Sequence, residues 1–559
     1  MMTRLCRLFG WTVLITAAGA GVAQAQGRGG GAWTTVSGDA QRSSSVRTDP
    51  KISAESMQKP GFQFLWKRKL DNKPVQLNSL TQPVLLPNII SYMGFKALAF
   101  VGGSSDNVYA IDYDLNRPFW NAHLSTASTT PGTAACPGGL TTITRQTPLA
   151  AAVPGGPGGR GRAGAPGAAA TGAPAPGAAA PGAPGAQEGR IAGPGGGRSG
   201  RGNAGPAIAG GRGGGDNVFA VSSGGMAHVL NPQVGTDQIP PVKFLPANAR
   251  VVGSVLVDGV LYAATTGNCG GAANGIWAVD LVSDAKPVTT FETQGAGIAG
   301  AIAPTFGTDG TVYVATGRGD SPTANAVVAL EAKTLKQKDW FSAGTSPFTS
   351  APVVFQHKGK DLIVAASRDG RLYVLDSASI GGADHKTPLS KTSQFSSGTA
   401  DTTGLATWLD AAGTRWVVAA STGPVHGDTK FAMGNGAVTN GALVAFSLVE
   451  ENGAPTLQPQ WASRDLTSPV TPAVVNGVIF AVSSGQFAGA GTMTAAERAQ
   501  RSTPAVLYAL DAATGKQLWS SGSTITSFVN GIGPSAGDSQ VYVVTYDGTV
   551  YAFGMPMER

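Results

Sequence analysis

The stretch 506–519, VLYALDAATGKQLW, decides the fold of this 559-residue chain. Its first part, 506–510, alternates large apolar and small residues, which is the pattern of a half-buried strand. The turn-forming residues 511–515 follow, and Gly515 suits a backbone with positive φ. A second strand then ends at Trp519. The stretch therefore predicts an antiparallel hairpin that carries an aromatic side chain at its end.

Weaker copies of this hairpin recur along the chain, at 107–120, 217–235, 275–291, 326–340, 371–380 and 442–461. A different hairpin precedes most copies, as in 254–267, SVLVDGVLYAATTG. Two hairpins give four antiparallel strands, which make one blade of a β-propeller. The repeats therefore predict an all-β, eight-bladed propeller of four-stranded antiparallel blades. Seven blades are the alternative, because the copy at 217–235 is degenerate.

The last repeat stops after its third strand, near Phe553. The segment 62–70, FQFLWKRKL, is the expected outer strand of that blade, with Trp66 in the position of the repeated aromatic. An N-terminal strand that completes the last blade closes the ring and removes exposed sheet edges.

The N-terminus has the pattern of a signal peptide at 1–25. Arg4 and Arg7 precede a short apolar run, and residues 23–25, Ala-Gln-Ala, form a small-x-small cleavage site. The run is too short to span a bilayer comfortably, and no other stretch is long and apolar enough. We expect a periplasmic or secreted protein with no membrane span after cleavage.

A Gly, Ala and Pro-rich segment at 150–215 has almost no aliphatic bulk to bury, so we expect a disordered linker. The expected organisation is the signal peptide, an N-terminal segment and first blade at 26–149, this linker, and the remaining blades at 216–559. The linker carries six Arg against one Glu, so it accounts for much of the net charge of +7. A nucleic-acid-binding face is therefore not indicated.

Without Cys6, which lies in the signal peptide, the chain keeps Cys136 and Cys269. In an exported protein these two can form a disulfide, or they can remain two buried thiols. Both cysteines are expected on the side of the ring that carries the long loops, so the pair is compatible with a bond.

The unit at 509–519 resembles the tryptophan-docking repeat of the quinoprotein alcohol dehydrogenase family. Trp33, the segment 37–44 (SGDAQRSS) and Trp66 also resemble the N-terminal part of that family. The resemblance implies the propeller fold, and it implies packing roles for Trp120, Trp340, Trp461 and Trp519. It covers non-enzymatic scaffolds as well as dehydrogenases that use pyrroloquinoline quinone (PQQ) and Ca²⁺.

The connections between second and third strands are expected on one side of the ring, and four of them are long: 267–275, 317–325, 422–441 and 485–505. Loops on a rigid scaffold commonly bind ligands. The resemblance places a calcium-binding Asn in a Thr-Gly-Asn turn, but this chain has Arg318 after Thr316 and Gly317. A guanidinium cannot bind Ca²⁺. The Asn is kept one blade earlier, as Asn268.

Two functions stay open from the sequence. The first is a binding scaffold whose small-molecule or protein ligand is held on the long-loop side by Arg318, Asp320, Asn268 and Asp369, without metal. The second is a PQQ- and Ca²⁺-dependent alcohol or sugar dehydrogenase. We expect quinone-dependent turnover to be absent or very weak, because Arg318 would repel Ca²⁺ and could instead pair with carboxylates. No Cys-x-x-Cys-His haem motif is present.

Overall fold

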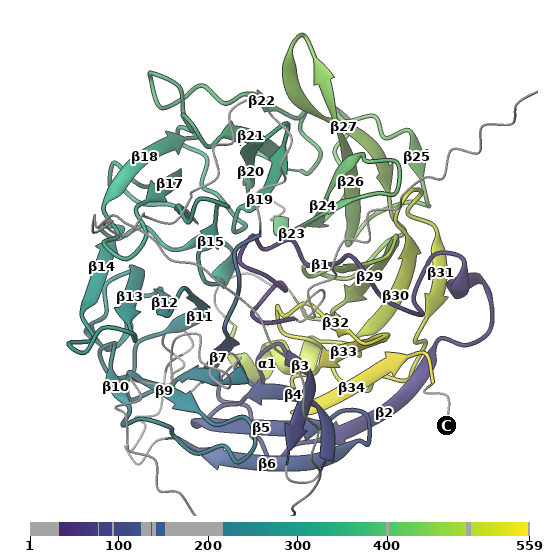
Figure 1. Cartoon of the computed structure of the whole chain (residues 1–559). Coiled ribbons are helices and arrows are strands. Elements are labelled where there is room, and N and C mark those ends of the chain that lie inside the picture. The colour runs from purple at the N-terminus through teal and green to yellow at the C-terminus, as the bar shows by residue number, and fades with distance from the viewer. Residues whose placement is uncertain are drawn as a thin grey trace, which may run out of the picture. The chain divides into compact units, whose positions relative to one another are not determined.

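The computed structural model describes residues 33–76, 78–91, 94–124, 133, 136, 141–150, 216–397, 402–487 and 493–556. These residues form eight antiparallel sheets arranged as a ring (Figure 1). The eight-bladed propeller is thereby confirmed, and the seven-blade alternative is wrong. The predicted signal peptide and all but the first residue of the predicted linker lie outside the described residues.

Blades one to four each contain four strands, whose bounds are as follows. Blade one has β3 (Val84–Ser91), β4 (Gly94–Gly102), β5 (Asn107–Asp112) and β6 (Arg117–His123), and blade two has β7 (Thr142–Arg145), β8 (Val218–Val221), β9 (Met226–Leu230) and β10 (Val242–Lys243). Blade three has β11 (Val251–Val257), β12 (Val260–Thr265), β13 (Gly275–Asp280) and β14 (Val288–Glu292), and blade four has β15 (Thr305–Phe306), β16 (Val312–Ala315), β17 (Ala326–Leu330) and β18 (Gln337–Ser342).

The other four blades include the strands that depart from the simple order. Blade five has β19 (Val353–His357), β20 (Lys360–Ser367), β21 (Arg371–Asp376) and β22 (Ser390–Lys391), and blade six has β23 (Thr402–Leu409), β24 (Arg415–Thr422), β26 (Gly441–Glu451), β27 (Ala454–Ala462) and β25 (Met433–Gly434). Blade seven has β1 (Ser45–Val46), β28 (Ala473–Val475), β29 (Val478–Ser483), β30 (Val506–Asp511) and β31 (Gln517–Ser520), and blade eight has β32 (Ser535–Gly537), β33 (Gln540–Val544), β34 (Thr549–Gly554) and β2 (Gln63–Lys69). Short helical segments are η1 (Ser56–Gln58), η3 (Cys269–Gly271), η4 (Ala299–Ala301) and α1 (Ala495–Arg501).

The ring closes as the sequence predicts. Strand β2 pairs antiparallel with β34, with Phe64 opposite Phe553 and Lys69 opposite Thr549. The N-terminal strand therefore supplies the outer position of the last blade, and the first and last parts of the chain share one sheet.

Tryptophans fasten neighbouring blades to one another. Trp461 of blade six is fully buried and donates from Nε1 to the carbonyl of Ala512 in blade seven at 3.0 Å. Its ring lies on Gly515, where an added Cβ would come within 2.4 Å of a ring atom. Trp120 makes the equivalent bond to Pro232, and Trp66 to Tyr113. The repeated Trp and the turn glycine therefore form a single docking contact between blades.

The N-terminal segment 33–49, which we call the central strap, winds around the inside of the ring (Figure 1, purple). The first strand of each of blades one to seven makes a hydrogen bond with it, in chain order. The strap residues are Trp33, Thr34, Thr35, Ala40, Gln41, Ser43 and Ser44, and their partners are Leu85, Arg145, Ser254, Phe306, Val354, Thr407 and Val474. Asp49 reaches blade eight, where Ser539 donates to it from its amide and hydroxyl.

All connections between second and third strands emerge on one side of the ring, which we call the loop face. Those of blades one, five and eight are short, and those of blades three, four, six and seven are long, as predicted. The predicted linker connects β7 to β8, the first and second strands of blade two. No described helix is long and apolar enough to cross a membrane.

Candidate ligand-binding site

A cavity of about 400 Å³ opens at the centre of the ring. Its walls come from residues just before or at the start of the first strands of several blades, and from second-to-third-strand connections. Both kinds of segment lie at the loop face. Val36 and Ser37 of the central strap contribute to its lining, so the strap limits the cavity inside the ring. A cavity of this size suits a small molecule.

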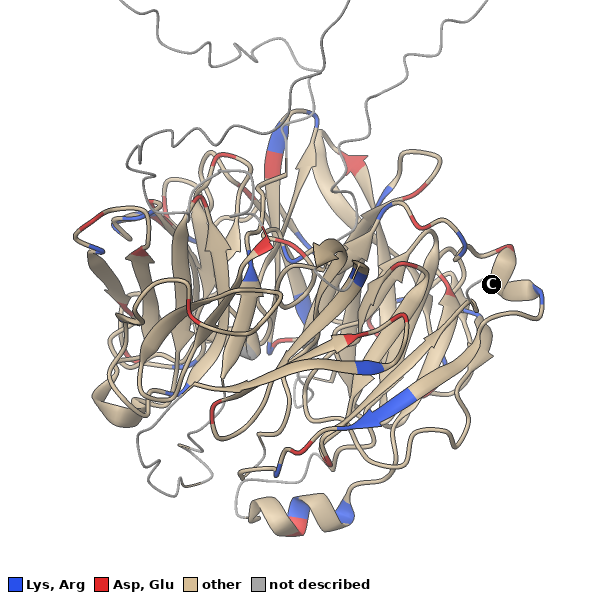
Figure 2. Cartoon of the chain, turned by 60° about the horizontal axis from the view of Figure 1, so that its bottom comes forward, with Lys and Arg blue, Asp and Glu red and all other residues tan. Residues whose placement is uncertain are grey.

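The loop of blade seven adds α1 to this wall. Figure 2 shows α1 standing off the sheets at one side of the ring. Its start is fixed by a capping box, in which the Thr494 side chain accepts from the Glu497 amide and Glu497 accepts from the Thr494 amide. Gln486 and Arg498 of this loop line the cavity.

Arg498 presents a guanidinium that has no hydrogen bond to the described residues. The side chain is half-buried, and its Nε atom is buried with no hydrogen-bond partner among the described residues. A buried N–H group without a partner costs free energy, and more so when the group is charged. Such a group at a cavity wall is a ready partner for an anion.

A second guanidinium lines the cavity from another blade. Arg250 immediately precedes β11, and its side chain is half-buried. Desolvation by burial lowers the pKa of Arg250 from its ordinary value, although an arginine remains charged at neutral pH. The cavity wall therefore carries two positive charges.

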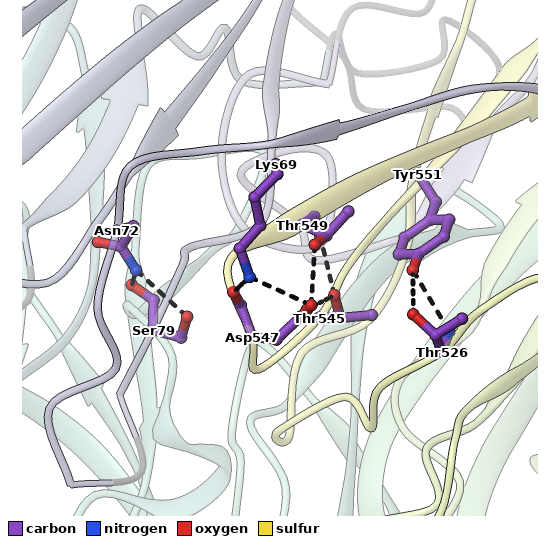
Figure 3. A network of polar contacts seen from close by, with 8 residues as sticks. All are labelled: Lys69, Asn72, Ser79, Thr526, Thr545, Asp547, Thr549 and Tyr551. Atoms are coloured by element: carbon purple, nitrogen blue, oxygen red, sulfur yellow. Dashed lines mark hydrogen bonds and ion pairs between the residues drawn. The ribbon is translucent and has the colours of Figure 1, made fainter.

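The β33–β34 turn forms the wall at the seam of the ring, and Asp547 holds its shape (Figure 3). Asp547 accepts hydrogen bonds from Thr545 and Thr549, and Lys69 of the N-terminal strand lies 3.2 Å away. Burial alone would raise the pKa of Asp547, but these hydrogen bonds and Lys69 together outweigh it and lower the pKa below its ordinary value. The turn thereby places Tyr546 at the wall, where its hydroxyl donates to the Gln76 carbonyl at 2.6 Å.

The donor set of the cavity does not fit a calcium ion. Among the described residues that line it, none carries a carboxylate, whereas two carry a guanidinium. Ca²⁺ takes six to eight oxygen ligands and favours carboxylates. The described part of the chain also contains no group of three His, Cys, Asp or Glu that could hold a metal. The cavity suits an anion in place of a metal.

The four residues predicted from the sequence lie elsewhere on the loop face. Asn268 is in the β12–β13 loop, Arg318 and Asp320 are in the β16–β17 loop, and Asp369 is in the β20–β21 turn. None of them lines the central cavity. Blades three, four and five thus bring them to the same side of the ring, around the cavity and not within it.

Their side chains differ in how far the protein already engages them. Arg318 and Asp320 are exposed. Asn268 exchanges two hydrogen bonds with Asn274, which stabilise its own loop. Asp369 accepts from the Tyr373 hydroxyl at 2.7 Å, while its other oxygen is buried without a partner in the part of the chain that the structure describes. Arg318 and Asp320 are therefore the freer pair of this set.

A disulfide joins Cys136, which follows blade one, to Cys269 in the β12–β13 loop. Both cysteines lie in connections that belong to the loop face. The bond ties the link between blades one and two to the long loop of blade three.

The sequence reasoning missed Arg250 and Arg498. Arg498 belongs to the 485–505 loop, which was recognised as long but not assigned a charged group. Arg250 directly precedes a predicted first strand, and such positions border the centre of every propeller. Its position directly before a predicted first strand could therefore have identified Arg250 as a residue near the centre of the ring.

Comparisons with known proteins agree with this fold. The family model described as "Outer membrane protein assembly factor BamB" matches residues 488–555. No curated protein matches the sequence. Among solved structures, a europium-containing methanol dehydrogenase has a TM-score of 0.54 at 11% identity, with 94% of this chain and 99% of that chain covered.

A quinohemoprotein alcohol dehydrogenase from Comamonas testosteroni has a TM-score of 0.50 at 12% identity, with 94% of this chain and 81% of that chain covered. Residues 488–555 are therefore similar to that family, and the chain shares its propeller fold with these solved structures. At these identities the similarity to the dehydrogenases concerns the fold, and function has to come from the site.

Proposed function

We propose that this PQQ-like propeller is an exported binding protein that holds an anionic ligand in its central cavity, without a metal and without a redox reaction. The observation that carries the proposal is the half-buried guanidinium of Arg498, whose Nε is buried without a partner among the described residues and which shares the cavity with Arg250 and with no described carboxylate. Arg binds carboxylates and phosphates through bidentate charge-assisted hydrogen bonds.

Export is supported by the signal-peptide pattern at 1–25 and by the Cys136–Cys269 disulfide, since such bonds persist in oxidising compartments. Expression in a bacterial host, followed by fractionation and thiol labelling, tests this part. We expect a processed protein outside the cytoplasm with no reactive thiol. An unprocessed cytoplasmic chain with three reactive thiols, those of Cys6, Cys136 and Cys269, would contradict it.

The ligand class can be tested with the purified mature chain. We expect the Tm to rise with small carboxylates and phosphates and to stay unchanged with neutral amides of the same shape, because only a ligand that binds the folded state stabilises it. Added EDTA should not alter these shifts. Equal shifts with the neutral amides would contradict anion binding.

The dehydrogenase alternative predicts a different result. It requires Ca²⁺-dependent binding of PQQ in calorimetric titration and dye reduction with an alcohol or sugar. We expect no calcium dependence and no dye reduction, because the cavity offers guanidinium groups where that reaction needs oxygen ligands.

A further inference from the structure

The two guanidinium groups of the central cavity differ in whether the protein already uses them. Arg250 has an interaction within the protein. The Arg498 side chain has no hydrogen bond to any described residue, and its Nε is buried. A guanidinium that has lost water without gaining an acceptor is stabilised by an anion through charge-assisted hydrogen bonds. The cavity therefore suits a ligand with a single anionic group, placed at Arg498.

Thr142 is a second polar residue of the wall with an unused hydrogen-bonding group. It is only 5% exposed, and its hydroxyl has no partner among the described residues. Thr142 is the first residue of β7, and Figure 1 draws α1, which carries Arg498, beside β7. Both residues line the same cavity. An anion bound at this part of the wall would receive hydrogen bonds from the guanidinium and from the hydroxyl.

Other polar side chains of the wall are engaged in hydrogen bonds within the protein. Gln82 donates to the carbonyls of Gly533 and Pro534. The Thr545 hydroxyl donates to the carbonyl of Thr549. These side chains hold the segments of the wall together, and they are therefore less available to a ligand than the guanidinium and the hydroxyl described above.

Much of the remaining wall is apolar. Ile143 follows Thr142 in β7, and Val36 belongs to the central strap. The other blades add Leu80, Val252, Ile302, Ile532 and Val544. An aliphatic chain in the cavity would replace water on these side chains, which favours binding roughly in proportion to the apolar area buried. The cavity therefore combines a site for one anionic group with an apolar surface inside the ring.

We propose that the ligand of this cavity is an amphipathic anion, with one carboxylate or phosphate bound by Arg498 and Thr142 and an aliphatic chain that packs against the apolar wall. The inference rests on the proposed function and adds the number of anionic groups and the apolar chain. A second anionic group at the other end of the chain would lose its water beside apolar side chains, which costs free energy. A dianion of equal length should therefore bind more weakly.

The test is a series of calorimetric titrations of the mature protein with straight-chain monocarboxylates, from acetate to decanoate, and with dicarboxylates of equal length. We expect the affinity for monocarboxylates to rise about fourfold with each added methylene until the cavity is filled, since each methylene adds buried apolar area. Each longer dicarboxylate should bind at least about tenfold more weakly than its monocarboxylate match, because its second charge is desolvated.

Two variants test the residues that bind the anionic group. Arg498→Gln and Thr142→Val should each lower the affinity for octanoate about tenfold, because each removes a hydrogen bond to a charged group. Thr142→Ser, which keeps the hydroxyl, should restore most of the affinity that Thr142→Val loses. Arg117→Gln, at an exposed site on the opposite side of the ring, is the matched control for the arginine and should leave the affinity unchanged. The Tm of each variant without ligand shows that it is folded.

The outcomes separate the two proposals. No binding of any carboxylate or phosphate would overturn both. An affinity that does not depend on chain length, or that is equal for matched mono- and dicarboxylates, would overturn the amphipathic ligand while leaving anion binding intact. An unchanged affinity in folded Thr142→Val would overturn the placement of the anionic group between Arg498 and Thr142.

Discussion

Two arginines near the centre of the ring, Arg42 and Arg498, differ in how many hydrogen bonds the protein offers them. Arg42 of the central strap is 1% exposed, and its guanidinium donates to Thr35 Oγ1, to the Val36 carbonyl and to the Pro304 carbonyl of blade four. Arg498 lies in the cavity wall, and its buried Nε has no partner among the described residues. The Nε of Arg42 is likewise buried without a partner, but its terminal nitrogens have these three acceptors, whereas the Arg498 side chain has no hydrogen bond to any described residue.

This difference separates a structural charge from a binding charge. Burial lowers the pKa of Arg42 to about 10, so the group stays protonated at neutral pH and needs its acceptors. The carbonyls that surround Arg42 tie the strap to itself and to blade four. At Arg498 no acceptor is present among the described residues, which is why that residue carries the proposed function.

The largest expected effect is a loss of stability when the charge of Arg42 in the central strap is removed. Arg42→Met should lower the free energy of unfolding by about 3 kcal/mol, because buried carbonyls of Val36 and Pro304 lose their donor. Arg498→Met should change it by less than about 0.5 kcal/mol, because no side-chain hydrogen bond to a described residue is lost and the Met side chain keeps most of the apolar packing. Urea denaturation of both variants measures the difference. Similar losses in both would mean that Arg498 is structural too.

The blades were predictable from the sequence because each is built from local contacts. Alternating strands, a turn glycine and a terminal Trp repeat in the chain, and the Trp461 and Gly515 contact needs only neighbouring repeats. The closing strand at 62–70 was predictable for the same reason, since the last repeat visibly lacked one strand.

The strap and the cavity were not predictable in this way. The strap has no repeat, and its carbonyls bond to the first strands of blades that are far apart in the chain. The cavity wall is assembled from separate segments, so the meeting of Arg250 and Arg498 exists only in the closed ring. The residues predicted together with Arg318 all lie in connections between second and third strands. The prediction therefore identified the loop face but not the cavity.

A smaller effect is expected where the strap ends, at the seam between blades eight and one. Burial, followed by the charges of Asp538 and Asp112, raises the pKa of Asp114 to about 6, while Lys96 acts in the other direction. Asp538 itself lies near Asp49 of the strap, which raises its pKa further. The folded state therefore binds a proton at Asp114 more strongly than the unfolded chain does.

The sign of the pH dependence follows from that difference. The wild-type protein should gain stability as the pH falls from above 6 toward 4, and this gain is lost as the pH rises again. Asp114→Asn should raise the free energy of unfolding by about 1 kcal/mol at pH 8, a value reduced for solvent screening, and by less at pH 5. Asp284→Asn, at an exposed turn residue, is the control for urea titrations at both pH values. A pH-independent gain would mean that charge is not the cause.

The smallest expected effect concerns ligand affinity and the loops that surround the cavity on the loop face. Arg318 is exposed in the β16–β17 loop, outside the cavity lining, so water and salt screen its charge from an anion held beside Arg498 in the central cavity. Arg318→Gln should weaken binding of a small carboxylate or phosphate by only about twofold, as expected for an exposed charge pair. A calorimetric titration in about 0.5 M salt should remove even this difference in affinity. A loss as large as that of Arg498→Gln would instead move the ligand out to the set that the sequence predicted, with Asn268, Asp320 and Asp369 around Arg318. The affinities of the two variants, measured side by side, therefore decide whether the ligand lies in the central cavity or among the surrounding loops of the loop face.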